Sequence, residues 1–380
     1  MSRPLEHVRV LDFTRIFSGP YTTLLFADMG AEVVKVEHPE YGDDSRLYGP
    51  IIGDTSGYFE TLNRGKKSIA IDYRSEHGQQ ILRQLTPHFD IVVENFRVGQ
   101  MARYGLDYPV LRELNPRLVY ASISGYGQFG DKAHLGCYDI VAQAASGLMS
   151  LTGLPQMPLK TGPAIADAIS GLTAAVGILG ALFRREKMGE GAYVDVAMVD
   201  SVFAILENTL ATYSATQQVP DRQGNTDAAI APFDAFEVMD GWVVLAIGNN
   251  RLWQRFVSLV GEHINRPEFA NNELRLQNYN QLRSLIADWL AHHPTETALK
   301  LLQEAQIPSG PIRTIDELAT DAQLEARDML LKVQVDDEHL LTVPGSPIHI
   351  SGASRTNTGR APKLGEHTSE ILAELEAVSH

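Results

Sequence analysis

The sequence predicts an α/β fold whose larger part is a doubly wound, open, mostly parallel sheet. First, strand-like and helix-like segments alternate to about residue 200, as in folds built on a parallel sheet. Second, the 23 residues 161–183 carry a single charged side chain, Asp167, which predicts an interior helix. Third, from residue 233 the pattern changes to a hairpin followed by helices, which predicts a smaller α+β domain.

The chain opens with a strand–helix–strand unit. Residues 7–13 predict a strand, 21–30 a helix and 32–37 a second strand, a spacing typical of parallel strands joined by a crossover helix. The first turn contains only Gly19, so the GxGxxG motif of dinucleotide-binding proteins is absent. The polar, Gly-rich segment 38–57 predicts a long loop, and loops of this length are more often functional than idle.

The alternation of strands and helices then continues. Further strands are expected at 67–73, 90–96, 118–127 and 192–199, and helices at 75–89, 99–114 (two short ones), 138–153 and 200–216. Ligands of doubly wound sheets bind at the carboxyl ends of the strands. The turns after Phe13, Glu37, Asn95 and Ser124 are therefore expected to share one rim.

The polar stretch 218–232 contains Pro and Gly and predicts a linker. After it we expect a hairpin turning at Met239-Asp240-Gly241 and helices at about 250–261, 279–292 and 295–306. These patterns predict a large domain at 1–224, a small α+β domain at 225–325, and a return to the large domain at 326–380, with a final helix from about 366.

The segment 161–183 is expected to be buried nearly all round, with Pro163 near its start and Gly189 near its end. A carboxylate inside a protein is costly unless it is paired or used. On the residues alone, Asp167 is either a structural acid facing the positive first turn of its helix or a functional group. The segment is long enough to span a bilayer, but its Asp, Ser, Thr and glycines favour the core of a soluble protein.

Composition excludes several classes of protein. The net charge of −15 argues against a nucleic-acid partner, because phosphate binding needs a basic surface. The single cysteine, Cys137, permits no intramolecular disulfide and is expected to be a packing residue in a cytoplasmic protein. The N-terminus lacks the apolar run of a signal peptide, and we expect no membrane partner. No zinc spacing, Walker loop, HExxH or GxSxG is present, so no metal site is expected.

Four blocks of the chain resemble family III CoA-transferases, also called the carnitine–bile-acid CoA-transferase family. The blocks lie at 10–37, 92–127, 136–153 and 161–172, in the family's order and at similar spacing. The resemblance implies a Rossmann-like large domain, a smaller domain and a homodimer of two interlocked subunits. It also implies CoA transfer from an acyl-CoA donor to a carboxylic acid, with acyl-CoA as a substrate and no permanently bound cofactor.

The family's nucleophilic aspartate matches Asp167. The resemblance implies that its carboxylate forms a mixed anhydride and then an aspartyl-CoA thioester, which divides one acyl transfer into easier steps. Backbone N–H groups near the start of the Asp167 helix are expected to stabilise the oxyanions.

The resemblance also assigns binding residues. Positions that match CoA-binding or acyl-binding residues of the family are Arg15, Ile16, Phe17, Ser18, Asn95, Phe96, Arg103, Tyr138 and Asp139, and the loop Gly248, Asn249 and Asn250 matches one that covers the aspartate. Phe17 stands where formyl-CoA:oxalate enzymes have Gln, so the resemblance leaves their particular substrate pair open. Arg15, Arg46 and Arg64 are expected to form a carboxylate clamp, which favours small dicarboxylates such as oxalate, succinate or itaconate.

Two alternatives remain. An α-methylacyl-CoA racemase or epimerase would keep the Asp but needs a His base, and Tyr138 replaces that His; a phenol is a poor base at neutral pH. A non-catalytic acyl-CoA-binding protein would not need an acid in an apolar segment.

Overall fold

The computed structural model describes residues 2–353 and 359–378 and divides into two compact units. The larger unit comprises residues up to Met149, Lys160–Gln217 and the chain from Asp321; the smaller comprises Ser150–Leu159 and Gln218–Thr320. The sequence assigned segment 150–159 to the large domain, but it belongs to the smaller unit. Two hydrogen bonds tie it to the chain that follows residue 217. The Arg222 guanidinium donates to the Leu154 carbonyl (3.0 Å), and the Gly224 N–H donates to the Gly153 carbonyl (3.0 Å). The predicted domain boundaries at 224/225 and 325/326 stay a prediction.

The larger unit contains a six-stranded parallel sheet in the order β10-β7-β6-β1-β2-β5. Its strands are β1 (Arg9–Asp12), β2 (Glu32–Glu37), β5 (Lys67–Ala70), β6 (Ile91–Glu94), β7 (Val119–Ser124) and β10 (Ala192–Ala197). The chain runs outward from β1 through β2 to β5, then returns to β6 on the other side of β1. The predicted doubly wound parallel sheet is confirmed, and its winding reverses between β1 and β6, where such sheets bind ligands.

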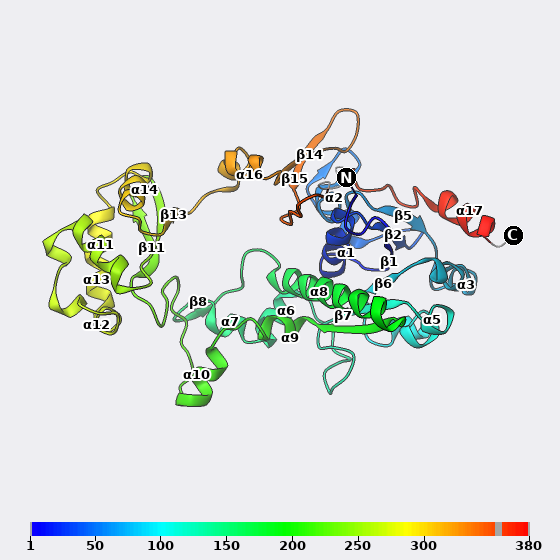
Figure 1. The fold of residues 1–380 in the computed structure, drawn as a ribbon, viewed down its shortest axis with the longest axis horizontal. Helices are drawn as coiled ribbons and strands as arrows, with labels where there is room; N and C mark the ends of the chain where they lie inside the picture. The colour runs from blue at the N-terminus through cyan, green and yellow to red at the C-terminus, as the bar shows by residue number, and fades with distance from the viewer. Residues whose placement is uncertain (1, 354–358, 379–380) are drawn as a thin grey trace. The chain divides into compact units, whose positions relative to one another are not determined.

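Helices cover both faces of this sheet (Figure 1). They include α1 (Ser18–Asp28), α3 (Glu76–Leu85), α4 (Gln100–Arg103), α5 (Tyr108–Leu114), α6 (Asp139–Ala145), α8 (Ile165–Met188), α9 (Met198–Phe203) and α17 (Thr368–Val378). Successive residues of a strand point to opposite faces. Val10 accordingly lies in a core with α1, α6, α8 and α9, whereas Leu11 lies in a core with α3, α4, α5 and α17.

Helix α8 lies close against α1 because small residues line its buried side. A Cβ on Gly171 would stand 2.7 Å from the Ser18 carbonyl oxygen, and the Thr22 hydroxyl donates to the Gly171 carbonyl (3.0 Å). The prediction that this segment is buried nearly all round is wrong, since the opposite side of α8 has no covering element within the described part of the chain. The exposed apolar side chains of α8 include Leu172, Val176, Leu179 and Phe183. By length and composition alone, α8 could cross a membrane.

Three other expectations need correction. The helix predicted at 138–153 is interrupted at Gly147 (φ +95°), giving α6 and the short α7 (Leu148–Leu151). The helix predicted at 200–216 is interrupted near Glu207 (φ +51°), giving α9 and α10 (Thr209–Thr216). The loop predicted at 38–57 contains a 3₁₀ helix, Asp44–Leu47, and leads into α2 (Gly57–Asn63) through a short hairpin, β3 (Ile51–Ile52) and β4 (Thr55–Ser56).

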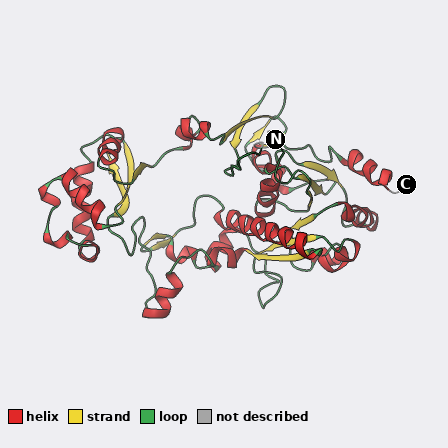
Figure 2. Cartoon of the chain, in the orientation of Figure 1, coloured by secondary structure: helices red, strands yellow, loops and turns green. Residues whose placement is uncertain are grey.

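The smaller unit has a three-stranded antiparallel sheet covered by helices (Figure 2). Its main elements are β11 (Phe233–Val238), β12 (Gly241–Ala246), β13 (Ser309–Pro311), α11 (Asn250–Val260), α12 (Asn272–Gln277), α13 (Tyr279–Leu290) and α14 (Thr295–Glu304). The predicted hairpin and three helices are present, while β13 and α12 escaped prediction because they are short. The smaller unit also contains β8 (Gly153–Leu154), β9 (Met157–Pro158) and α15 (Ile315–Leu318).

The larger unit also contains α16 (Ala322–Ala326) and the hairpin β14 (Leu330–Gln334) and β15 (Leu340–Pro344).

Candidate active site

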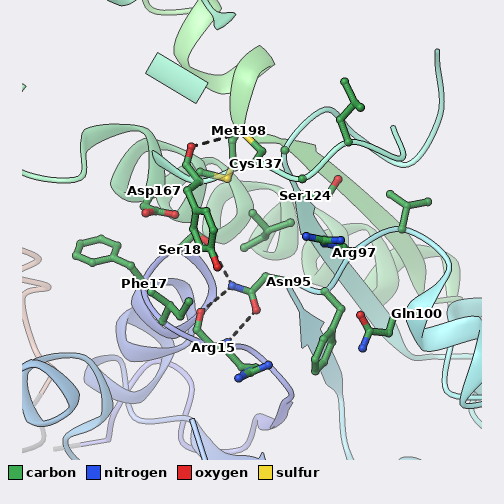
Figure 3. Close-up of a pocket in the computed structure, with 18 of the residues that line it drawn as sticks. Arg15, Phe17, Ser18, Asn95, Arg97, Gln100, Ser124, Cys137, Asp167 and Met198 are labelled. Atoms are coloured by element: carbon green, nitrogen blue, oxygen red, sulfur yellow. Dashed lines mark hydrogen bonds between the residues drawn. The ribbon is translucent and has the colours of Figure 1, made fainter. Parts of the chain in front are cut away.

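A cavity of about 450 Å³ opens at the carboxyl ends of β1, β6 and β7, where the winding of the sheet reverses. Its walls come from the turns after β1 and β6, the end of β7, segment 133–138 and Asp167. Asn95 joins the first two turns: its side-chain oxygen accepts from the Arg15 N–H (2.8 Å), and its amide nitrogen donates to the Arg15 carbonyl (2.8 Å). Figure 3 shows these contacts. The topology therefore brings two predicted binding segments into one wall.

Asp167 lies in the first turn of α8 and lines this cavity near Phe17 and Ser18 (Figure 3). Burial, and to a smaller extent the charge of Asp139, raise the pKa of its carboxyl to about 7, although a hydrogen bond with the Ser18 side chain opposes both effects. Asp167 is thus a partly desolvated carboxyl that titrates near neutral pH rather than in the range of a solvated Asp. This environment differs from that of a structural acid stabilised by its helix start.

The carboxylate of Asp139, a residue of α6, binds backbone N–H groups at the start of α8, the helix that carries Asp167. One of its carboxylate oxygens accepts from the N–H of Ala166 (2.8 Å) and more distantly from that of Asp167 (3.5 Å), and the other accepts from the Gln143 side chain (2.7 Å). The N-cap residue, Ala164, offers no side-chain cap of its own. The expectation that N–H groups near this helix start stabilise oxyanions is therefore wrong, because Asp139 already binds them.

Phe17, which lines the cavity, belongs to a cluster of aromatic side chains. The ring of Phe17 lies 5.8 Å from that of Tyr21 and 6.3 Å from that of Tyr58, which in turn lies 5.4 Å from Tyr48. Burial raises the pKa of the Tyr58 hydroxyl, and the Asp167 charge adds to this, so Tyr58 is electrostatically close to the aspartate. Tyr58 lies on α2, and no sequence motif around it predicted a position near Asp167.

Cys137 lines the cavity and is half-buried. Cys137 packs directly against the backbone of Gly125. This contact requires a glycine, because a Cβ on residue 125 would lie 2.1 Å from the Cys137 Cβ. Burial and then the carboxylates of Asp167 and Asp139 raise the pKa of the thiol to about 11. Cys137 is therefore a protonated thiol in the cavity wall rather than only the packing residue that the sequence predicted, and the same charges keep it a poor nucleophile.

The structure brings together most of the predicted site residues. Those that line the cavity are Arg15, Ile16, Phe17, Ser18, Asn95, Phe96, Tyr138 and Asp167. Asp139 does not line the cavity but binds the start of the Asp167 helix. Arg103 is exposed on α4 and does not line the cavity, and Gly248, Asn249 and Asn250 belong to the smaller unit. The binding roles of these residues stay predictions.

Sequence reasoning missed Asp44 and Arg97, which also line the cavity. Arg97 follows the Asn95-Phe96 block directly, so its position next to matched residues could have pointed to it. Asp44 lies in the segment expected to be a loop, where it binds the Arg15 guanidinium (2.5 Å).

The predicted three-arginine clamp is wrong for two of its members. The Arg46 guanidinium makes two hydrogen bonds to Glu37, both 2.7 Å. Arg64 is buried against both carboxylate oxygens of Asp28. Neither arginine lines the cavity, because buried acids of the large unit already bind them; only Arg15 of the three does.

Among the described residues, no group of three or more His, Cys, Asp or Glu could hold a metal ion.

Comparison with known proteins gives a consistent picture. The model of CoA-transferase family III matches residues 5–368. The chain is 37% identical to acetyl-CoA:oxalate CoA-transferase of Acetobacter aceti, covering 98% of this chain and 96% of that one. It is 39% identical to succinyl-CoA:mesaconate CoA-transferase of Haloarcula hispanica, covering 97% and 96%. A CAIB/BAIF family protein from Brucella suis has a similar structure, with a TM-score of 0.89, 36% identity, and 99% and 100% coverage.

Proposed function

Since the chain belongs to CoA-transferase family III and is a CoA-transferase, we propose that it works through covalent intermediates on Asp167 and that a small dicarboxylate is its acceptor. One observation carries the proposal: a partly desolvated carboxyl, with a pKa of about 7, stands in the wall of the cavity at the sheet's reversal point. A carboxylate stripped of part of its hydration is a better nucleophile.

The reaction needs no added proton donor or acceptor. An Asp167 carboxylate oxygen attacks the carbonyl carbon of the acyl-CoA thioester, and the C–S bond breaks to give a mixed anhydride and CoA thiolate. The thiolate attacks the Asp167 carbonyl carbon and releases the donor acid, which leaves aspartyl-CoA. The acceptor carboxylate then attacks that thioester, giving a second anhydride and free thiolate. Attack of the thiolate on the acceptor's acyl carbon releases the new acyl-CoA and regenerates Asp167.

The first turn of α1 is the better candidate for stabilising the oxyanions. The N–H groups at a helix start have no partner within their own helix, and they favour negative charge. α1 begins at Ser18, whose side chain hydrogen-bonds Asp167. We therefore assign oxyanion stabilisation to backbone N–H groups around Ser18 and Gly19.

The racemase alternative requires a base that removes the α-proton. No histidine is among the described residues that line the cavity, and Tyr138 occupies the place of the racemase His with its side chain largely exposed. Incorporation of deuterium from D2O at the α-carbon of a branched acyl-CoA distinguishes the two reactions. The proposed transferase does not catalyse this exchange, whereas a racemase does.

Two observations support a small dicarboxylate as acceptor. Relatives are named for oxalate and mesaconate. Arg97 and Arg15 line the cavity, Arg15 in a pair with Asp44, and guanidinium groups suit carboxylates. A screen of acids with succinyl-CoA and acetyl-CoA as donors tests this assignment. Dicarboxylates are expected to be used in preference to monocarboxylates of equal length, and the reverse preference would exclude them.

The lone cysteine supports a cytoplasmic location.

We expect the protein to be a homodimer that does not dissociate on dilution. The family resemblance implies interlocked subunits, and the exposed apolar side of α8 needs a partner surface; its most exposed members are Val176 (71%) and Phe183 (66%). Contiguous apolar patches on a single chain mark such interfaces. Sedimentation at nanomolar concentration is expected to show only dimer. A reversible monomer there would contradict the interlocked arrangement.

The loop Gly248–Asn250 is expected to shield the intermediates from water, by resemblance to the family's covering loop. Asn249 caps α11, its side chain accepting from the Leu252 N–H (3.0 Å), and Asn250 accepts from the buried Arg275 (3.0 Å). Replacing either asparagine would therefore disturb the fold as well. A Cβ on Gly248 meets no atom within 4 Å, so Gly248→Phe is the cleaner variant.

Gly248→Phe is expected to raise acyl-CoA hydrolysis relative to transfer several-fold, because a bulky loop closes less tightly over the anhydride. Both rates are measured in one assay from free CoA and product acyl-CoA. Gly248→Ala, which adds only a Cβ with no atom within 4 Å, is the control for replacing the glycine without adding bulk. An unchanged ratio of hydrolysis to transfer in a folded Gly248→Phe variant would remove the loop from the mechanism.

A further inference from the structure

The turn that leads from β1 to α1 contains a strained residue. Ile16 has a φ of +69°, in the left-handed region that β-branched residues almost never adopt. It stands between Arg15 and Phe17, and all three line the cavity. Strained backbone persists only where surrounding contacts fix it, and such residues gather at functional sites. The contacts of this turn therefore identify the groups that hold Ile16 in place.

One buried carboxylate binds Ile16 directly. The Ile16 N–H donates to Asp43, at 3.1 and 3.3 Å from its two oxygens. Asp43 is 1% exposed and is not part of the cavity wall. It also accepts from the Ser45 N–H (2.9 Å), which fixes the carboxylate at the start of the 3₁₀ helix.

A buried lysine fixes the other side of the same turn. Lys35, on β2, pairs with Asp43 (2.9 Å) and donates to the Thr14 carbonyl (2.6 Å). Burial alone would raise the pKa of Asp43, but Lys35 and the backbone N–H donors hold it at about 2, so the carboxylate is ionised throughout the neutral range. Asp43 and Lys35 therefore clamp the turn at two points, its Thr14 carbonyl and its Ile16 N–H.

We propose that Asp43 is a positioning residue for the transfer reaction: it holds Ile16 in the left-handed conformation and so places Phe17 and Ser18 against Asp167. The proposal rests on the proposed function of Asp167. Without the clamp, Ile16 relaxes to an ordinary conformation, since nothing else binds its N–H among the described residues. The Ser18 hydrogen bond to Asp167 and the start of α1 then move together.

A double-mutant cycle with residue 16 tests the proposal. Asp43→Asn is expected to slow single-turnover acylation of Asp167 about 30-fold, with a much smaller change in the KM for acyl-CoA. Glycine adopts positive φ about as readily as negative φ, so it does not need the clamp. In an Ile16→Gly background, Asp43→Asn is therefore expected to cost only about threefold. Ile16→Ala removes most of the side chain but keeps a Cβ, so the loss there should stay close to 30-fold.

A matched control separates positioning from general damage. Asp28→Asn also removes one partner of a buried ion pair in the large unit, with Arg64, but does not contact the turn. Its effect on acylation is expected to be the same whichever residue stands at position 16. Asp43→Glu keeps the charge and displaces the carboxylate by one methylene, so it replaces Asp43→Asn in the cycle if that variant does not fold.

Equal losses from the Asp43 substitution in the wild-type, Ile16→Ala and Ile16→Gly backgrounds would overturn the proposal, as would full activity of Asp43→Asn. These outcomes leave the role of Asp167 intact, because that role is tested by substitution and labelling of Asp167 itself. Conversely, normal transfer by an Asp167→Asn variant would contradict the proposed role of Asp167, whatever the double-mutant cycle of residues 16 and 43 shows.

Discussion

Replacing Asp167 with asparagine is expected to lower CoA transfer by at least about 10⁴-fold, equivalent to roughly 5 kcal/mol of transition-state stabilisation. The amide nearly preserves the shape of the side chain, but it is no nucleophile and cannot form the anhydride. Asp167→Ala is expected to lose transfer to the same extent. Both variants should still bind CoA, which calorimetry measures. Near-normal transfer by Asp167→Asn would show that another group carries the acyl chain.

The stability of Asp167→Asn provides the control for folding. Because burial raises the pKa of Asp167 from 3.8 to about 7, the folded state loses stability as pH rises through that interval, by up to about 1.4 kcal/mol per unit. Asparagine carries no such cost. The variant is therefore expected to be at least as stable as the wild type at pH 8, with the difference vanishing near pH 4. Denaturant unfolding at both pH values measures it.

Acylation of Asp167 is expected to follow the ionisation of its carboxyl. Below pH 7 the rate should fall about tenfold per pH unit, reaching roughly one hundredth of its plateau at pH 5, because only the carboxylate attacks. Above about pH 8 the rate should approach a constant plateau. Single-turnover measurements with acyl-CoA and no acceptor isolate this step. A rate that does not change between pH 5 and pH 8 would contradict the raised pKa.

Asp139→Asn tests the cause of that pH dependence. The negative charge of Asp139 helps to raise the pKa of Asp167, whereas the Ser18 hydrogen bond opposes the rise. Removing the charge should therefore move the midpoint of the acylation profile to lower pH, while burial still keeps it above that of a solvated Asp. An unmoved midpoint would remove Asp139 from the electrostatics of the site.

The order of strands and helices in the large unit could be predicted because each element carries a local pattern. The apolar run of Val10 and Leu11 in β1 and the spacing of Ile81, Leu82 and Leu85 in α3 follow directly from burial on the sheet. Asp167 stood out because no other charge accompanies it in its segment. Local patterns failed where a contact between distant segments decides the outcome.

Four pairings show why the remainder could not be predicted. Arg46 and Arg64 are equally plausible in sequence as carboxylate ligands, yet Glu37 and Asp28 bind them inside the fold. The positive φ of Ile16 depends on Asp43, which is 27 residues away in the chain. The occupied amide of Ala166 depends on Asp139, also 27 residues away. Such pairings are set by tertiary packing and leave no periodic trace in the sequence.

Chemical trapping of the acylated enzyme tests the role of Asp167 most directly. Wild-type protein incubated with acyl-CoA and no acceptor should accumulate an activated aspartyl group, which hydroxylamine converts to a hydroxamate and borohydride reduces if it is a thioester. Peptide mass spectrometry should place either change on Asp167, and Asp167→Asn should remain unlabelled. A label on another residue, or none at all while transfer proceeds, would contradict covalent catalysis by Asp167.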